Sequence, residues 1–315
     1  MAMVRFFSDP RMLDHAPPIG HPERPERLAS VLRHLERSTV RSACATGTVR
    51  EATDEELSRV HEVEYIDSLR RFEREGGGRI EADTWLGPQS LQAARLAAGS
   101  AIEAVSSVLD GPQKVAFCAV RPPGHHARPA HAMGFCLFDS VAAAAAHAIE
   151  VRGLARVLIV DWDVHHGNGT QEIFYADGRV GFLSIHRHPF YPGTGMADET
   201  GTGRGIGWTK NLPTLYGTPR KEIIRSFVSG LEELAERTKP ELVLISAGFD
   251  AVSDDPVGDL GLLPEDFEEL THAVQRVADS HAEGRIVSVL EGGYDPIALA
   301  RCVEVHLRAL GAETP

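Results

Sequence analysis

Short apolar runs alternate with helix-forming runs along the whole chain. The clearest apolar runs are ARVLIVD at residues 155–161, ELVLISAG at 241–248 and RIVSVLEGG at 285–293. A strand that is apolar at successive positions is buried on both faces, which is typical of parallel sheets covered by helices on both sides. The alternation therefore predicts an α/β protein: a three-layer α/β/α sandwich with a mostly parallel central sheet. No change in composition marks a boundary, so we expect residues 1–315 to form a single domain.

The same patterns predict where each element lies. Strands are expected at 3–7, 114–120, 155–161, 179–186, 241–248 and 285–293. Helices are expected at 22–37, 54–61, 64–78, 87–111, 139–153, 169–177, 218–238, 263–281 and 296–310. Apolar residues at helical spacing, and glycine or proline at the helix ends, support these boundaries.

Charge and hydropathy exclude several classes of partner. The formal net charge is −13, and an acidic surface repels phosphate backbones, so no direct nucleic-acid binding is expected. No apolar run approaches the roughly 18 residues that cross a bilayer, so no membrane span is expected. The first residues do not resemble a secretory signal, and the four cysteines form no C-x-x-C pair. We therefore expect a cytoplasmic location, with neither a disulfide framework nor a cysteine zinc site.

Four loops that follow predicted strands carry unusual chemistry. Ligands of open parallel sheets bind at the carboxyl ends of strands. The loops that follow such ends should therefore converge at one edge of the sheet. They are RPPGHHARPAHAMGFC at 121–136, DWDVHHGNG at 161–169, GFDAVSDDP at 248–256 and EGGYDP at 291–296.

Asp163, His165 and Asp250 are predicted to hold a metal ion. Asp161, Asp163 and His165 are spaced by two positions at a strand end, and such residues point to one side of an extended segment. Asp250 ends another strand and adds a carboxylate. Three ligands and an open fourth position suit a catalytic zinc, because the open position holds water or substrate. Alternatively, Asp161 and Asp163 cap the following helix, but the cluster as a whole favours the metal site.

Two adjacent histidines and one tyrosine are the further candidates for catalysis. The prolines and glycine of RPPGHHA favour a rigid, irregular loop, which lets both His125 and His126 face one site. Each imidazole needs a partner that fixes its tautomer, and Asp161 and Asn168 are the candidates. The alternative is a pair of surface histidines. Tyr294, after two glycines, is a candidate donor to a developing oxyanion.

Several segments together closely resemble the zinc-dependent histone deacetylase superfamily, which includes bacterial histone deacetylase-like amidohydrolases, acetoin-utilisation proteins and acetylpolyamine amidohydrolases. In chain order they are GHPERPERL, RPPGHHA, MGFC, DWDVHHGNGTQ, YPGTG, AGFD and EGGYD. The resemblance spans nearly the whole chain. It implies an arginase-like fold and a single deacetylase domain over 1–315. The asparagine in HHGNG and the sequence EGGYD make the chain similar to the class II and bacterial branch.

The resemblance implies a role for each candidate residue. Asp163, His165 and Asp250 are implied as zinc ligands, and His126 as the general base and later acid, supported by Asn168. His125 is implied as the companion histidine, hydrogen-bonded to Asp161. Tyr294 is implied as the residue that stabilises the transition state, and a tyrosine rather than a histidine at this position implies full deacetylase activity.

The resemblance also implies residues that contact the substrate. Phe135 and Tyr191 resemble the aromatic walls of the acyl-lysine channel, although phenylalanine is common where Tyr191 stands. Arg27 resembles the arginine of the acetate-release pocket, and Asp83 the aspartate at the rim. Gly134 and Gly293, beside these residues, complete the predicted substrate-binding set.

Structural potassium is a further implication of the resemblance. One potassium ion would share Asp161, Asp163 and His165 with Ser184 and Ile185. A second would use carbonyl groups near Phe174 and Val180. Three other histidines, His131, His186 and His188, are expected at the channel mouth or on surface loops.

The predicted function is zinc-dependent hydrolysis of the amide that joins an acetyl or other short acyl group to a lysine side chain. The predicted substrate is an acyl-lysine peptide or protein. The alternative within the same class is an acetylated small amine, as in acetylpolyamine deacetylation. Two other readings are an arginase-like ureohydrolase, which uses two manganese ions, and an inactive reader of acyl-lysine.

Overall fold

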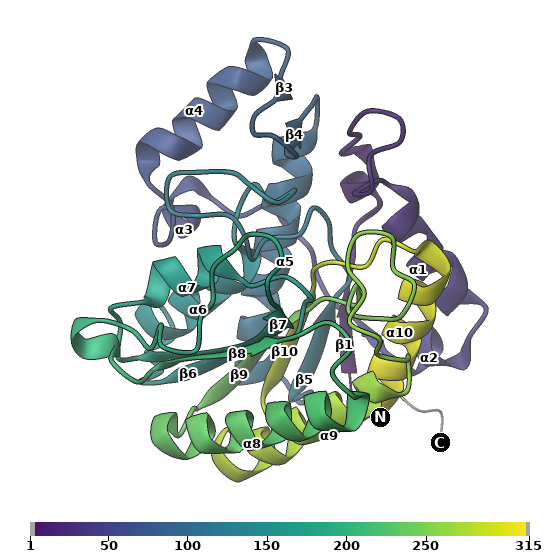
Figure 1. Cartoon of the computed structure of the whole chain (residues 1–315). Coiled ribbons are helices and arrows are strands. Elements are labelled where there is room, and N and C mark those ends of the chain that lie inside the picture. Colours follow the sequence, from purple (N-terminus) through teal and green to yellow (C-terminus); the bar gives the residue numbers. More distant parts are fainter. Residues whose placement is uncertain (1–3, 313–315) are drawn as a thin grey trace.

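The computed structural model describes residues 4–312, and its centre is a sheet of eight parallel strands (Figure 1). The strand order is β2-β1-β5-β10-β9-β6-β7-β8, and every neighbouring pair is parallel. The strands are β1 (Val4–Phe7), β2 (Ala45–Thr46), β5 (Val115–Cys118), β6 (Val157–Asp161), β7 (Val180–Arg187), β8 (Thr209–Thr214), β9 (Leu242–Ala247) and β10 (Ile286–Leu290). The fully buried strands β6, β9 and β10 are the apolar runs that predicted them.

Helices cover both faces of the sheet, which confirms the predicted α/β/α sandwich (Figure 1). One face contacts α5 and α6, and the other contacts α8 and α9, with α10 packed beside α9 and α1. The helices are α1 (Glu26–Glu36), α2 (Thr39–Ala43), α3 (Asp54–Leu57), α4 (Val63–Arg74), α5 (Ser90–Asp110), α6 (Ser140–Glu150), α7 (Asn168–Phe174), α8 (Arg220–Thr238), α9 (Asp266–His281) and α10 (Pro296–Ala309).

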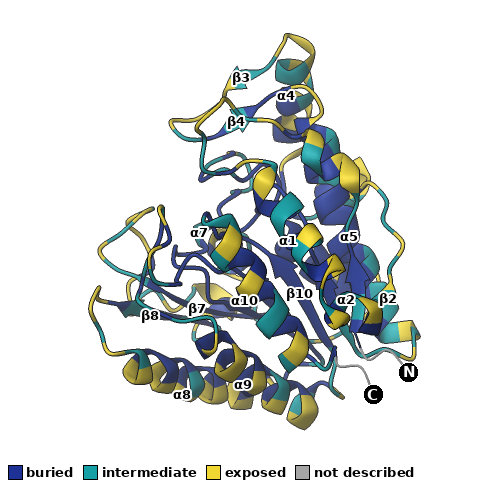
Figure 2. Cartoon of the chain, turned by 90° about the vertical axis from the view of Figure 1, so that its right-hand side faces the viewer, coloured by how far each residue is buried: buried dark blue, intermediate teal, exposed yellow. Residues whose placement is uncertain are grey.

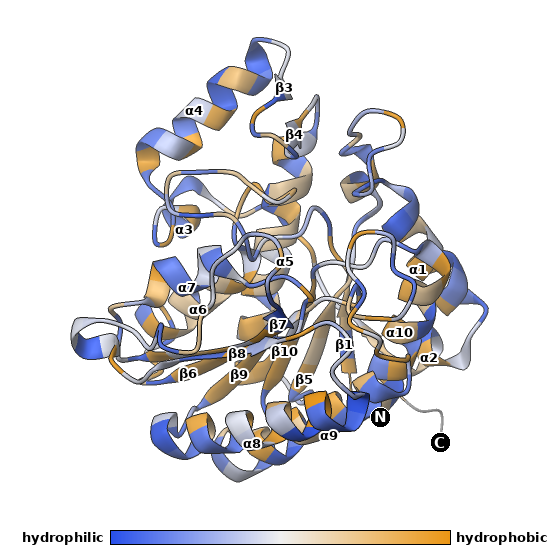
Figure 3. Ribbon diagram, viewed as in Figure 1, coloured by the Kyte–Doolittle hydropathy of each residue, from blue (hydrophilic) through white to orange (hydrophobic). Residues whose placement is uncertain are grey.

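Burial follows the amphipathic pattern of each helix. In Figure 2, α8 and α9 show exposed outer positions, and in Figure 3 polar and apolar residues alternate along α8. The alanine-rich α6 is different, because ten of its eleven residues are buried. Small side chains let this helix pack between the sheet and α5. Within residues 4–312, no helix is both long enough and apolar enough to cross a membrane.

Most predicted elements are present, but the short elements α2 and β2 and the short strands at 78–79 and 85–86 were not predicted. The edge strand β8 was not predicted, because Lys210, Asn211 and Pro213 interrupt any apolar run. The helix predicted over 54–61 ends at Leu57 after a single turn. The strand predicted over 3–7 begins outside the described residues, and β1 covers the rest of it.

The order of the strands brings the four chemically unusual loops together. These loops follow β5, β10, β9 and β6, which are successive neighbours in the sheet. Asp161, the last residue of β6, pairs in register with Ser246 of β9 and Ser184 of β7. All four loops therefore leave the sheet at the same edge, as the parallel arrangement requires.

A small antiparallel hairpin lies away from the main sheet. It consists of β3 (Gly78–Arg79) and β4 (Trp85–Leu86), with Arg79 directly opposite Trp85. The hairpin follows α4 and faces the loop that precedes α1 (Figure 1). Both segments lie on the side of the molecule at which the four loops emerge.

Candidate active site

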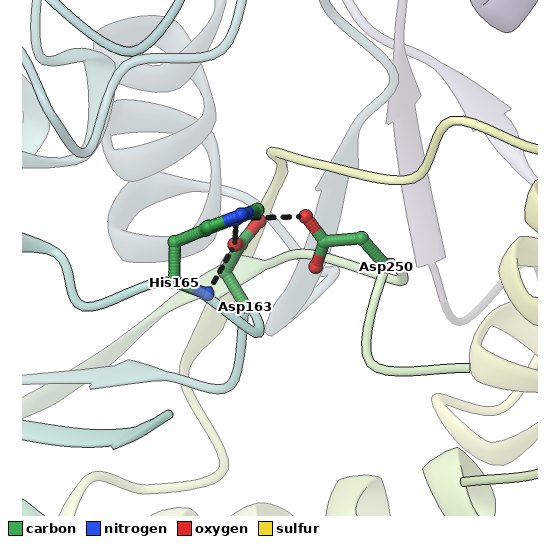
Figure 4. A group of neighbouring side chains, drawn as sticks. All are labelled: Asp163, His165 and Asp250. Carbon is green, nitrogen blue, oxygen red and sulfur yellow. Dashed lines mark hydrogen bonds and ion pairs between the residues drawn. The ribbon is translucent and has the colours of Figure 1, made fainter. Parts of the chain in front are cut away.

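The structure brings Asp163, His165 and Asp250 together at the edge of the sheet (Figure 4). One ligand atom from each residue lies within 4.8 Å of the others, and all three residues are buried. The Nδ1 atom of His165 lies 3.0 Å from Asp163 Oδ1 and 3.2 Å from Asp250 Oδ2. Among the described residues, this is the group of three potential ligands that has metal-binding geometry.

The buried charges of this group suit a cation. One N–H of His165 cannot satisfy two carboxylates, and Asp250 Oδ2 is buried without a hydrogen bond. Burial and the neighbouring Asp163 raise the pKa of Asp250 to about 7. Burial lowers the pKa of His165, but the hydrogen bond to Asp163 and the nearby carboxylate of Asp250 outweigh it and raise this pKa to about 9. A divalent ion would neutralise both carboxylates, and zinc accepts this mixture of oxygen and nitrogen ligands.

Backbone groups fix the two carboxylates in place. Asp163 accepts hydrogen bonds from the N–H of His165 at 2.9 Å and of Gly292 at 2.8 Å. Asp250 Oδ1 accepts from the N–H of Val164 at 2.9 Å. A Cβ at Gly292 would lie 2.2 Å from Asp250 Oδ2 and 2.5 Å from Asp163 Oδ2. Only glycine therefore lets this loop approach the carboxylates so closely.

The tandem histidines lie beside the metal-ligand group, and each has a separate partner. His125 Nδ1 donates to Asp161 Oδ2 at 2.9 Å, and His126 Nδ1 donates to Asn168 Oδ1 at 2.7 Å. Their ring centroids are 4.0 Å apart. The pairs are those that the sequence left as candidates, and the alternative of two surface histidines is wrong, because both rings are buried.

The two imidazoles have opposite pKa shifts. Burial lowers the pKa of His125, but the carboxylates of Asp161 and Asp163 raise it well above its ordinary value. Burial and the neighbouring histidines, His125 and His165, hold the pKa of His126 well below its ordinary value. His126 is therefore neutral near pH 7, and a neutral imidazole is able to act as a base.

A channel of about 220 Å³ leads to these groups. Phe135, Phe190, Tyr191 and Val257 line its sides, and His126, His165 and Tyr294 are also part of its lining. Aromatic contacts hold the walls: His165 stacks on Phe190 at 5.2 Å, and Phe135 packs edge-on against Tyr294 at 5.6 Å. The sequence did not predict Phe190 or Val257 as channel residues, although each belongs to a loop that follows a strand.

Tyr294 lies in the channel wall above Arg27. The guanidinium of Arg27 is 4.8 Å from the centroid of the tyrosine ring. Arg27 is buried and donates to the carbonyl oxygens of Gly293 at 2.6 Å and Glu291 at 2.5 Å. Burial raises the pKa of Tyr294 well above its ordinary value, so its hydroxyl remains a proton donor.

Two further residues predicted to contact the substrate, Asp83 and Gly134, line the channel. Asp83 lines the channel together with Gly134, whose N–H donates to Asp83 Oδ1 at 3.1 Å. A Cβ at Gly134 would lie 2.3 Å from the ring of His126, so the backbone lies directly against the predicted base. Gly293 precedes Tyr294 with a φ of 124°, a conformation that favours glycine.

The residues implied for the first potassium site lie at the end of β6 and in the neighbouring strand β7. Ser184 pairs in register with Asp161, and Ile185 follows it in β7. Phe174 ends α7 and Val180 begins β7. The potassium sites stay predictions.

The expectation for His186 is wrong, whereas those for His131 and His188 are compatible with the structure. His186 is fully buried and hydrogen-bonded to Ser184 and to the carbonyl oxygen of Gly195. His186 is therefore part of the interior, under the loop that carries Gly195. His131 is exposed and His188 half-buried.

Two acidic residues of the four loops accept hydrogen bonds from backbone N–H groups. The sequence patterns did not predict this role. Asp255 accepts from the N–H of Tyr294 at 2.6 Å and of Val257 at 2.9 Å, so one carboxylate joins two channel loops. Glu291 Oε2 accepts from the N–H of Gly124 at 2.6 Å and of His125 at 3.2 Å. Each ties a wall of the channel to the loop of another strand.

The fold and the site define an α/β protein with a candidate single-metal active site at the carboxyl ends of its central strands. A family model described as "Histone deacetylase domain" matches residues 21–310. The chain belongs to the histone deacetylase family, and the predicted family is confirmed. This family is in general zinc-dependent.

Known relatives agree with this assignment. Polyamine deacetylase HDAC10 of Homo sapiens is 41% identical over 300 residues, which cover 91% of this chain and 44% of that protein. The histone deacetylase-like amidohydrolase of Pseudomonas aeruginosa is 38% identical, over 90% of this chain and 75% of that protein. The crystal structure of the HDA15 HD domain has a TM-score of 0.92 at 38% identity and covers 98% of this chain and 88% of its own. The chain spans less than half the length of the human protein.

Proposed function

We propose that this chain is a zinc-dependent deacetylase that removes acetyl or other short acyl groups from lysine side chains of peptides or proteins. The observation that carries the proposal is the channel, whose aromatic sides meet His126, His165 and Tyr294. Apolar walls bind the methylene stem of lysine through the hydrophobic effect. The groups suited to amide hydrolysis lie along the same channel. A single narrow substrate would therefore contact the apolar walls and these groups at once.

Asp163, His165 and Asp250 would hold the zinc ion. When bound, zinc supplies a Lewis acid that activates water and polarises the amide carbonyl. His165 also lines the channel, so a substrate in the channel would reach an ion held by these residues.

His126 moves the protons in this proposal. Its Nδ1 proton is held by Asn168 Oδ1, so Nε2 is the basic nitrogen. Nε2 accepts the proton of the attacking water, and the same nitrogen then gives that proton to the leaving amine. The low pKa of His126 keeps the imidazole neutral before the reaction begins.

Tyr294 and His125 support the same step. The tyrosine hydroxyl donates a hydrogen bond to the oxyanion that forms from the carbonyl oxygen. His125, paired with Asp161 at 2.9 Å, is a buried cation beside the developing negative charge. Asp255 and Glu291 position the two loops that carry these groups.

The second candidate is an acetylated polyamine, which one observation favours. The similarity to a protein named polyamine deacetylase HDAC10, at 41% identity, supports an acetylated polyamine as the substrate. A polyamine carries further ammonium groups, which require carboxylates near the mouth. Among the described residues that line the channel, Asp83 is the one carboxylate, and Val257 is apolar. A single carboxylate offers little to several ammonium groups, so we favour acyl-lysine.

Direct competition between the two substrate classes tests the proposal. We expect an acetyl-lysine peptide to be hydrolysed with a kcat/KM at least about tenfold above that of acetylspermidine. A tenfold ratio corresponds to about 1.4 kcal/mol of differential binding. Acetate release is measured for both with the same zinc-loaded preparation. A preference for acetylspermidine would overturn the lysine assignment. Two manganese ions per chain with urea release would indicate the ureohydrolase alternative.

A further inference from the structure

A second cavity lies beside the channel mouth, between segments that are far apart in the sequence. It has a volume of about 220 Å³. The loop before α1 forms one side and the β3–β4 hairpin the other, and Figure 1 shows these two segments facing each other. We call it the rim groove, and the residues that matter below are Pro18, Ile19, His21, Arg79, Asp83 and Trp85.

The rim groove and the channel share a wall. Asp83 lines both cavities. The ring of His21 lies between two backbone acceptors, with Nδ1 2.9 Å from the carbonyl oxygen of Glu23 and Nε2 3.0 Å from that of Asp83, so the ring is held in place. The same ring packs edge-on against Phe135, a channel wall, at 4.9 Å. The rim groove is therefore within reach of the residues next to a side chain that enters the channel.

A tight turn presents an apolar side chain on one side of the groove. The N–H of His21 donates to the carbonyl oxygen of Pro18 at 3.0 Å, and Gly20 has a φ of 91°. Such a turn needs glycine at its third position. It leaves Ile19 fully exposed, at 108% of its reference area. A large aliphatic group held in solvent by a turn gains from a partner that covers it.

The opposite side combines an indole with a guanidinium. Trp85 is half-buried, and Arg79 pairs with it directly across the hairpin. Directly opposed residues of an antiparallel pair project from the same face. A planar cation next to an indole favours an aromatic ring, because both stack on its face.

We propose that the rim groove binds the side chain of a residue next to the acyl-lysine in a peptide substrate, and that it prefers an aromatic side chain. The proposal rests on the proposed function, because it assumes that acyl-lysine occupies the channel. It adds a determinant of peptide sequence that the channel itself does not supply. A free acetylated amine has no adjacent residue and would not use the groove.

Peptides that differ only beside the acetyl-lysine test the proposal. One set places Phe or Gly before the acetyl-lysine, and a second set places them after it. We expect Phe to raise kcat/KM about tenfold over Gly at one of the two positions, which corresponds to about 1.4 kcal/mol. Acetyl-lysine amide without neighbouring residues serves as the reference substrate.

Two variants connect the preference to the groove. Ile19→Ser and, separately, Trp85→Ala should reduce the Phe-over-Gly ratio to about twofold or less, with hydrolysis of the reference substrate unchanged. Ile206→Ser is the matched control, because Ile206 is 64% exposed and lies outside the groove. This control should keep the wild-type ratio. Equal rates for Phe and Gly in the wild type, or an unchanged ratio in both groove variants, would overturn the proposal.

Failure of the proposed function gives a different pattern. If neither the reference substrate nor any peptide is hydrolysed, the deacetylase assignment is wrong. Binding of fluorescein-labelled Phe and Gly peptides to the same protein then tests, without turnover, whether the rim groove binds an aromatic side chain. Tighter binding of the Phe peptide that Ile19→Ser abolishes supports the groove, and equal binding refutes it.

Discussion

Asp250→Ala should abolish both zinc binding and deacetylase turnover. The substitution leaves one carboxylate and one imidazole, which is fewer than the three protein ligands of a catalytic zinc site. Zinc content of the purified protein, measured by mass spectrometry, should fall from about one ion per chain to near zero. The rate of acetate release should fall below detection, since the groups that remain cannot polarise the amide.

The same substitution should leave the fold intact, which separates a lost ligand from a lost structure. Asp250 and Asp163 are buried carboxylates that face each other, so removing one relieves repulsion in the metal-free protein. Added zinc should raise the Tm of the wild type and not that of the variant, because only a state that binds the ion is stabilised by it. Asp279→Ala, an exposed position on α9, is the control and should behave like the wild type. Full zinc content in Asp250→Ala would contradict the ligand assignment.

Tyr294→Phe should reduce kcat by about 10²–10³ with little change in KM, the loss typical of one oxyanion donor. The ring contacts with Phe135 and Arg27 do not involve the hydroxyl, so the channel wall should persist. Zinc content should also be unchanged. Steady-state kinetics with an acetyl-lysine peptide give both parameters.

A second tyrosine in the channel provides the matched comparison. Tyr191→Phe removes a hydroxyl from another wall, where the ring packs against His126 at 5.2 Å. We expect its kcat to stay within a few fold of the wild type, because this hydroxyl has no assigned part in the reaction. Equal losses in the two variants, or unchanged turnover in Tyr294→Phe, would contradict the role given to Tyr294.

The sheet could be predicted from the sequence because its central strands are apolar on both faces. The runs that became β6, β9 and β10 are buried at every position, so burial and sequence carry the same information. The polar edge strand β8 carries no such signal, since only part of it is buried. The neighbouring positions of β5, β10, β9 and β6 depend on strand order, which no local pattern contains.

The candidate site was predictable where its residues lie close together in the sequence. Asp163 and His165 share one strand end, and the two-residue period places them on one side. Phe190 and Val257 became visible only when distant loops formed the channel. Asp255 and Glu291 bind backbone N–H groups, which every residue but proline possesses, so composition does not reveal their partners.

His186 is a residue that the sequence placed near the surface and the fold buries. We expected it at the channel mouth or on a surface loop, although the strand predicted over 179–186 includes it. The side chain is fully buried in β7 and lies under the loop that carries Gly195. A buried histidine with two hydrogen-bond partners is stable in the interior, and the tertiary structure alone supplies those partners.

The most direct test of the account is the position of the zinc ion in crystals of the zinc-loaded protein. Anomalous diffraction at the zinc absorption edge should give one strong peak per chain. That peak should lie about 2.0–2.2 Å from oxygen atoms of Asp163 and Asp250 and from a ring nitrogen of His165. A peak elsewhere, or none between these three side chains, would contradict the account.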